Sequence, residues 1–280
     1  MKSRSVVSGV ALSTGGQQGP YRPAERSVAL LYGIACHSLF VLGISAMIHA
    51  IAIGMTGGLG GLDGGAAWAA NALLALQFPL LHSWLLSDRG RAVLDRLAPL
   101  GLGRDLGTTS YAAIASLQLL ATFVLWSPTR TVWWAAEGAA RGVSVALHAG
   151  SWLLLLKTMV DAGLDLQSGA RGWWAVVRNR RPRWRPFSTT GCFRFTRQPI
   201  YVAFFLILWT GPVWSPDRLL LAVIWSLYCI FGPLLKERRC LRFEGERFRR
   251  YQSVVPYWLP TLRPARLPAA PVAPVGSPEP

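Results

Sequence analysis

Charge is scarce in this sequence of 280 residues: only 15% are Asp, Glu, Lys or Arg, and only 13 are acidic. Cysteine is scarcer still, since Cys36, Cys192, Cys229 and Cys240 are the whole set and no two form a CxxC pair. We therefore expect reduced thiols rather than a disulfide framework, and no metal site. The sequence also lacks a phosphate-binding loop, a dinucleotide-type glycine fingerprint and HExxH. Soluble ATPases, Rossmann oxidoreductases and zinc proteases thus have no support.

Hydrophobic residues, in contrast, make up 52% of the chain, and 13 residues are tryptophans, which favour the membrane interface. Six hydrophobic stretches approach the length that crosses about 30 Å of hydrocarbon. They cover residues 28–55, 66–86, 107–127, 140–160, 199–214 and 217–235. The last two are short and closely spaced, so we predict that they form a tight helical hairpin. The pattern predicts an all-α, polytopic integral membrane protein with about six transmembrane helices.

The basic residues are unevenly distributed around these stretches. Four Lys and Arg residues precede the first stretch, four lie between the second and third, eight between the fourth and fifth, and nine follow the sixth. Hence 25 of the 29 basic residues lie on one side, which the positive-inside rule assigns to the cytoplasm together with both termini. The net charge of +16 is thereby explained by topology and by contact with anionic membrane lipid, and we expect no nucleic-acid partner.

The two ends of the chain differ in composition from the rest. The N-terminal residues are rich in Ser and Gly, and the C-terminal residues are rich in Pro and Ala. We predict disordered cytoplasmic segments at 1–27 and 261–280. Residues 28–260 then form the membrane domain, and its part from about 183 to 260 carries the densest pattern of charged and aromatic residues.

Two arginines stand beside a predicted helix start. Arg194 and Arg197 precede Pro199, which suits the first turn of a helix because its missing N–H would have no partner there. Backbone amides at such a start, with guanidinium groups beside them, favour a carboxylate or a phosphate. The alternative is that these arginines only stop translocation and contact lipid headgroups.

Glu237 lies at the cytoplasmic end of the sixth stretch, where a carboxylate is costly unless it is paired or used. We expect it either to form an ion pair with Arg194 or Arg197 across the hairpin, or to accept hydrogen bonds from a ligand. Farther along, Phe248 and Tyr251 share a helix face with charged residues. This amphipathic helix either lies on the bilayer or folds back to cover a pocket.

Several of these residues stand in an ordered pattern. It consists of Arg197-Gln198-Pro199-Ile200-Tyr201, Lys236-Glu237, Gly245 with Phe248 and Tyr251, and Val255-Pro256. In order and spacing, this stretch resembles the isoprenylcysteine carboxyl methyltransferase superfamily. Weaker similarities to its bacterial methanethiol S-methyltransferase and NnrU-like branch extend through the first half. They are Leu31-Tyr32-Gly33, His82-Ser83, Thr109-Ser110-Tyr111, Ala115-Ser116-Leu117 and Pro186-Phe187.

The resemblance implies methyl transfer from S-adenosylmethionine to a small or lipophilic thiol, at the cytosolic face of a bacterial inner membrane. We expect catalytic roles for His82, as a base that helps to remove a thiol proton, and for Tyr201. The cofactor-binding residues that the resemblance implies are Arg194, Arg197, Gln198, Pro199, Tyr201, Glu237 and Tyr251. For His82, the alternative is a polar side chain that only caps or snorkels at the interface.

Three positions depart from the superfamily pattern. Gln198 stands in place of the motif His, Lys236 in place of the first motif Glu, and Phe193 in place of a common Tyr. Gln cannot carry a proton, and Lys reverses a charge beside the implied cofactor. Two alternatives therefore remain open: an NADPH-dependent membrane enzyme of the sterol-reductase type, and a non-catalytic accessory membrane protein. The sequence gives no oligomeric state.

Overall fold

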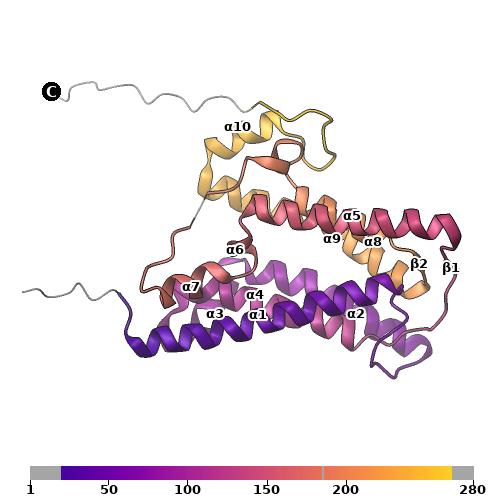
Figure 1. Ribbon diagram of the computed structural model, residues 1–280. Coiled ribbons are helices and arrows are strands. Elements are labelled where there is room, and N and C mark those ends of the chain that lie inside the picture. The colour runs from indigo at the N-terminus through magenta and orange to yellow at the C-terminus, as the bar shows by residue number, and fades with distance from the viewer. Residues whose placement is uncertain (1–19, 185, 267–280) are drawn as a thin grey trace, which may run out of the picture.

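The computed structural model describes residues 20–184 and 186–266, and their regular structure is almost entirely helical (Figure 1). Of the segments predicted to be disordered, 1–27 and 261–280, residues 1–19 and 267–280 fall outside the described part, whereas residues 23–27 belong to the first helix. Six helices correspond to the six hydrophobic stretches: α1 (Pro23–Ala52), α2 (Gly64–Leu85), α4 (Gly103–Val124), α5 (Gly138–Ala162), α8 (Pro199–Trp209) and α9 (Pro216–Glu244). Shorter elements are α3 (Asp88–Leu97), α6 (Leu164–Gln167), α7 (Ala170–Val177), α10 (Glu246–Val254), and 3-10 turns at Pro99–Gly101 and Gly191–Arg194. Strands β1 (Trp134–Ala135) and β2 (Val213–Trp214) pair antiparallel.

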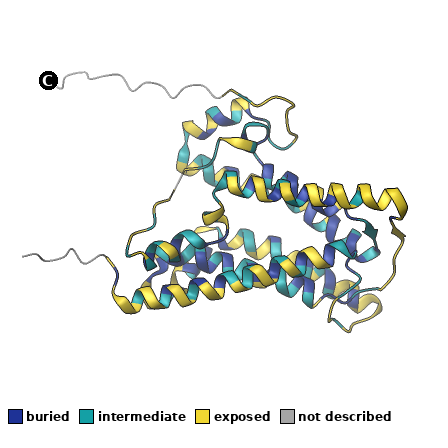
Figure 2. Ribbon diagram, in the orientation of Figure 1, coloured by how far each residue is buried: buried dark blue, intermediate teal, exposed yellow. Residues whose placement is uncertain are grey.

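Four of the described helices, α1, α2, α5 and α9, are both long and apolar enough to cross a membrane. Their large apolar side chains face outward, as at Leu31, Leu73 and Leu153, which are 67–68% exposed. Figure 2 shows this exposed outer surface around a buried interior. A surface of this kind is stable only against lipid. The prediction of an all-α membrane protein is therefore confirmed.

Helices α4 and α8 lie where spans were predicted but differ from the other four. Helix α8 has 11 residues, short for a bilayer crossing. Helix α4 buries polar side chains, among them Ser116, Gln118 and Thr122, against its neighbours. Within this interior, the Gln118 amide donates to Gln77 Oε1 at 2.7 Å, and Gln77 donates to the Thr122 hydroxyl at 2.9 Å. Polar residues are thus placed where helices contact one another, and the number of spans stays a prediction.

Helices α1, α2, α3 and α7 pack around α4. Helix α1 runs along α4 and approaches it closely at Gly43, where a Cβ atom would lie 2.7 Å from the Ser116 carbonyl oxygen. Small residues allow such close helix contact inside membranes. The buried core then continues through Met47, Phe123 and Trp225, which joins α1, α4 and α9.

The basic segments gather at one end of this bundle. The N-terminal end of α1 contacts α7, where Arg26 Nε donates to the Val177 carbonyl at 2.9 Å. At the same end, Arg242 of α9 pairs with Asp88 of α3 at 2.9 Å. The weakly charged connections meet at the opposite end, where β1 pairs with β2 and Ser215 donates to the Gly54 carbonyl (Figure 1). This segregation of charge agrees with the positive-inside pattern.

The predicted hairpin between α8 and α9 is present. Ser215 caps α9 by accepting a hydrogen bond from the Arg218 backbone N–H at 3.0 Å, and Pro216 occupies the first helical position. The hairpin returns the chain so that residues just before α8 meet the C-terminal end of α9. The candidate site lies at that meeting point.

After α9 the chain reverses at Gly245, whose φ of +49° is strained for residues with a side chain. Helix α10 consequently folds back rather than extending along a membrane surface. Its Phe248 and Tyr251 are buried together with Val255 and pack against Phe187. Of the two alternatives for this amphipathic helix, the structure shows the one in which it folds back, and its role as the cover of a pocket stays a prediction.

Candidate functional site

Glu237 is the centre of the candidate site, and its side chain is almost fully buried in the C-terminal part of α9. The Arg197 guanidinium binds it through both oxygens, with Nε 2.8 Å from Oε1 and Nη2 3.3 Å from Oε2. Gln198 Nε2 donates to Oε1 at 2.7 Å, and Gln252 Nε2 donates to Oε2 at 2.7 Å. Each carboxylate oxygen therefore receives two hydrogen bonds, which satisfies a buried charge.

Arg197 also ties the C-terminal segment to the start of α8. Its Nη1 donates to the carbonyl oxygens of Gln252, at 3.1 Å, and Val255, at 2.7 Å, while its backbone N–H donates to the Pro256 carbonyl at 2.9 Å. The guanidinium group also lies 5.6 Å from the centre of the Tyr257 ring. Of the two arginines considered as partners of Glu237, the structure selects Arg197.

Arg194 occupies a different place. Its Nε donates to the Ala265 carbonyl at 3.1 Å, and the Ala265 backbone N–H donates to the Arg194 carbonyl at 2.8 Å. It therefore contacts the segment after α10 and not Glu237. Pro199 begins α8, as the sequence predicted, and it is buried.

The two polar departures from the superfamily pattern contact each other. Lys236 Nζ donates to Gln198 Oε1 at 3.1 Å, and Nε2 of the same Gln198 amide donates to Glu237 Oε1. Gln suits this position because it accepts from a cation on one side and donates to a carboxylate on the other. The two replacements are therefore a matched pair in space, although 38 residues separate them in sequence.

We expect Gln198 and Lys236 to be energetically coupled. Gln198→His alone places an imidazole against the ammonium group, and Lys236→Glu alone sets a second carboxylate beside Glu237. The double variant replaces the mismatched groups with a His–Glu pair, so it should recover about 0.5–3 kcal/mol relative to the sum of the single effects. A double-mutant cycle on thermal unfolding in detergent measures this coupling, and additive effects would contradict it. Lys157→Glu, outside this contact, is the control for charge reversal.

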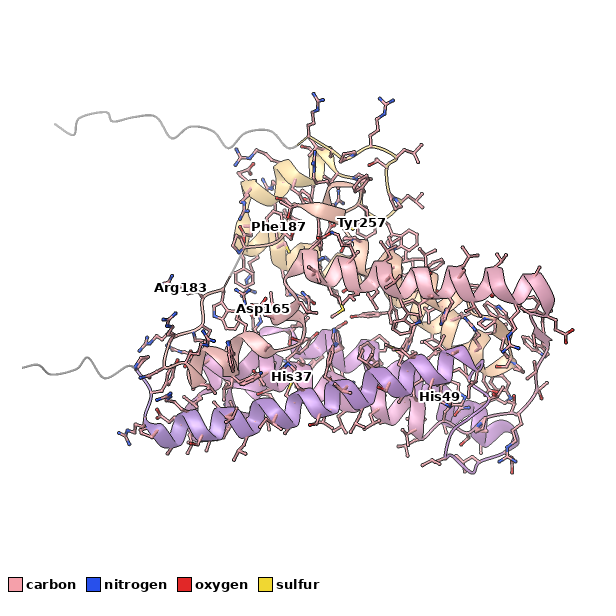
Figure 3. All side chains as sticks on the ribbon, viewed as in Figure 1. His37, His49, Asp165, Arg183, Phe187 and Tyr257 are labelled. Atoms are coloured by element: carbon pink, nitrogen blue, oxygen red, sulfur yellow. The ribbon has the colours of Figure 1, made fainter. Side chains whose placement is uncertain are left out.

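Aromatic side chains surround the charged cluster. The Lys236 ammonium lies 5.6 Å from the Phe193 ring centre and 6.0 Å from that of Tyr201. Tyr251 of α10 donates its phenol hydrogen to the Phe193 carbonyl at 2.7 Å. Burial, more than any nearby charge, raises the pKa of Tyr251, so it remains a donor. Figure 3 shows Tyr257 and Phe187 around the C-terminal segment, away from His37 and His49 on α1.

The two residues with predicted catalytic roles, His82 and Tyr201, both lie beside Tyr228. Ring centres are 6.4 Å apart for His82 and Tyr228, and 5.9 Å apart for Tyr201 and Tyr228. The Tyr228 side chain also interacts with those of Ser83 and Tyr201. The structure therefore connects the end of α2 to the charged cluster through one ring that sequence reasoning missed. The sequence did contain a sign of this: Tyr228, Gly232 and Lys236 follow one another at intervals of four residues, which places them on one face of α9.

Tyr111 of α4 was also missed as a site residue. Its hydroxyl group lies 2.5 Å from His82 Nε2, and Phe78 stacks on the His82 ring at 4.8 Å between centres. His82 is thus held inside an aromatic environment. This contrasts with the alternative of a side chain that only snorkels into water.

No metal centre accompanies these groups in the described part of the chain, where no three His, Cys, Asp or Glu residues are grouped to hold an ion. The four cysteines are free thiols in the structure. The site is therefore built from one buried ion pair, two amides, one ammonium group and several aromatic rings.

Known proteins with similar sequences include several of one name. A methanethiol S-methyltransferase of Bradyrhizobium diazoefficiens is 28% identical over 247 residues, covering 84% of this chain and 83% of the relative. A protein of the same name from a Pseudomonas species is 27% identical, covering 82% of this chain and 89% of the relative. Another from Crocosphaera subtropica is 25% identical, covering 85% of this chain and 94% of the relative. No family model and no solved structure matches. The resemblance drawn from the motifs is thereby confirmed: over most of its length the chain is similar to methanethiol S-methyltransferases.

Proposed function

We propose that this protein is a membrane methyltransferase that uses S-adenosylmethionine to methylate a small thiol. The observation that carries the proposal is the similarity over more than four fifths of the chain to proteins named methanethiol S-methyltransferase. The Arg197–Glu237 ion pair supports it, because it joins the motif segment at Arg197 to the motif segment at Glu237.

The charged cluster suits the amino-acid end of such a cofactor. A guanidinium and a carboxylate side by side match a ligand that carries both an ammonium and a carboxylate group. In the structure, Arg197 and Glu237 are fully engaged with Gln198, Gln252 and backbone carbonyls. Binding therefore exchanges these internal hydrogen bonds for equivalent bonds to the ligand. When bound, the cofactor supplies an electrophilic methyl group on a sulfonium cation.

The aromatic side chains suit the sulfonium end of the cofactor, which carries the methyl group. Phe193 and Tyr201 present rings that stabilise a cation, as they already do for the Lys236 ammonium, and Tyr228 lies beside Tyr201. Packing of these rings excludes water, and methyl transfer is favoured when the acceptor sulfur is held in line within a dry site. We place the acceptor thiol beside His82, whose ring centre is 6.4 Å from that of Tyr228.

We further propose the complete topology of a bacterial inner-membrane protein: six spans, with α4 and α8 crossing inside the bundle, and both termini cytoplasmic. Supporting this is the gathering of Arg26, Arg242 and α3 at the same end as Glu237. The site then faces the cytoplasm, where S-adenosylmethionine is made available. A lipophilic thiol is the second class of acceptor, reached from the surrounding lipid.

Calorimetry on the protein purified in detergent tests the proposal. We expect S-adenosylmethionine and S-adenosylhomocysteine to bind at micromolar concentrations, and NADPH not to bind. With methanethiol added, gas chromatography should detect dimethyl sulfide formed in proportion to enzyme. A well-folded sample that binds NADPH alone would instead support a reductase, and one that binds none of the three an accessory protein.

A further inference from the structure

His82 carries an unusual unsatisfied atom. Its Nδ1 is buried and has no hydrogen-bond partner in the part of the chain that the structure describes. Its other ring nitrogen, Nε2, is 2.5 Å from the Tyr111 hydroxyl oxygen. Buried polar side-chain atoms almost always have a partner, so one that lacks it next to a candidate site points to a use.

The hydrogen-bond inventory around His82 determines which nitrogen carries the proton. A neutral imidazole has one N–H donor, and the Tyr111 phenol has one O–H donor. The Tyr111 hydroxyl also lies 3.5 Å from the His82 carbonyl oxygen. That carbonyl is in the last turn of α2, where Leu86 N–H donates to Ser83 instead.

Only one tautomer uses both donors. If Nε2 is protonated, it donates to the Tyr111 oxygen, and the phenol donates to the His82 carbonyl. If Nδ1 is protonated, the phenol donates to Nε2 and the Nδ1–H donor is buried without an acceptor. A buried donor without an acceptor is costly, so the first tautomer is favoured and Nδ1 keeps a bare lone pair.

We propose that Tyr111 is a positioning residue that holds His82 with its proton on Nε2, so that the bare Nδ1 takes the proton of the acceptor thiol. This inference rests on the proposed function and extends it to the acceptor side of the same site. The dry, aromatic surroundings formed by Phe78 and Tyr228 leave Nδ1 as the base available to a thiol that enters there.

The proton and electron balance is simple. The thiol S–H bond breaks as the Nδ1–H bond forms, and the electron pair remains on the acceptor sulfur. That sulfur then bonds the methyl carbon of the sulfonium donor, while the donor sulfur keeps the pair of the breaking S–CH₃ bond. The imidazolium afterwards returns its proton to water. The titratable and charged groups that interact with His82 or with its aromatic partners are Tyr111, Tyr201, Tyr228, Cys229 and Arg239, and Arg239 favours the thiolate by its charge.

Nitrogen NMR of histidine-labelled protein tests the tautomer without any turnover. The His82 signals, identified by their loss in His82→Gln, should show a protonated Nε2 and an unprotonated Nδ1. In Tyr111→Phe the preference should be lost and both tautomers should appear. A protonated Nδ1 in the unmodified protein, or a tautomer unchanged by Tyr111→Phe, would overturn the positioning role.

Kinetics and binding test the base. His82→Gln should lower kcat for thiol methylation roughly 100-fold or more, because general bases contribute about 10²–10⁴-fold, while S-adenosylmethionine affinity stays within about twofold. Tyr111→Phe should lower kcat about tenfold and shift the pH–rate profile. His37→Gln, a histidine on α1 that contacts the Gly33 carbonyl, is the matched control. Unchanged kcat in His82→Gln would overturn the base assignment, whereas an unmodified protein that neither binds the cofactor nor methylates thiols would overturn the proposed function itself.

Discussion

Replacing Glu237 by alanine is expected to abolish measurable S-adenosylmethionine binding and thiol methylation. The substitution removes the acceptor of Arg197, Gln198 and Gln252 together, and it leaves the guanidinium group buried without its counter-ion. Breaking a buried pair by removing one partner costs about 3–5 kcal/mol. The attachment of the C-terminal segment to the start of α8 should loosen as a result, because Arg197 also holds the carbonyls of Gln252 and Val255.

Two further variants separate binding from folding in this experiment. Glu237→Gln keeps the size and one acceptor oxygen but not the charge, so it should retain the fold and still lose binding at least tenfold. Glu246→Ala is the matched control, since Glu246 lies on α10 and its pair with Arg249 is exposed on both sides. Calorimetry and thermal unfolding are measured on all three. A Glu237→Ala protein that binds the cofactor as well as the unmodified one would refute the role of this carboxylate.

Arg218→Met is expected to cause the largest loss of stability without touching the candidate site. Arg218 is almost completely buried at the opposite end of the bundle. Its guanidinium donates to four carbonyl oxygens, at distances between 2.8 and 3.5 Å, which belong to Ile51, Ile207, Leu208 and Val213. These atoms lie at the C-terminal ends of α1 and α8 and in β2, where helix carbonyls lack partners and carry negative partial charge.

The methionine variant leaves these carbonyls buried and unsatisfied, for a cost of roughly 3–5 kcal/mol. The unfolding temperature in detergent should fall by on the order of 10 °C, as estimated for a chain of this size. Arg249→Met, which removes an exposed arginine, should change it by no more than a degree or two. Equal melting temperatures for Arg218→Met and the unmodified protein would show that water replaces the guanidinium group there.

Gly211 should respond in the same direction as Arg218. A Cβ atom at this position would lie 2.0 Å from Arg218 Nη1, so alanine must displace the guanidinium from the carbonyls. The hairpin between α8 and α9 therefore depends on a charged side chain, and on the space left for it, rather than on turn residues alone.

Much of the architecture was determined by the sequence by itself. Transfer of a residue into lipid depends mainly on its own side chain, so hydropathy located all six helices, and the distribution of arginine marked the end at which basic segments gather. The start of α8 at Pro199 and the cap at Ser215 follow from local backbone chemistry, which a short stretch of sequence contains.

The partners inside the site were decided only by the tertiary structure. Sequence reasoning identified Glu237 as a carboxylate that needs a partner, but Arg194 and Arg197 were equivalent candidates until the hairpin and α10 set their positions. The contact between Lys236 and Gln198, and the placement of Tyr111 and Tyr228 beside His82, join helices that are far apart in the chain. Such pairings depend on the rotation and depth of each helix in the bundle. Those quantities come from packing summed over the whole molecule, whereas composition and local spacing determine only which segments become helices and which of their faces are apolar.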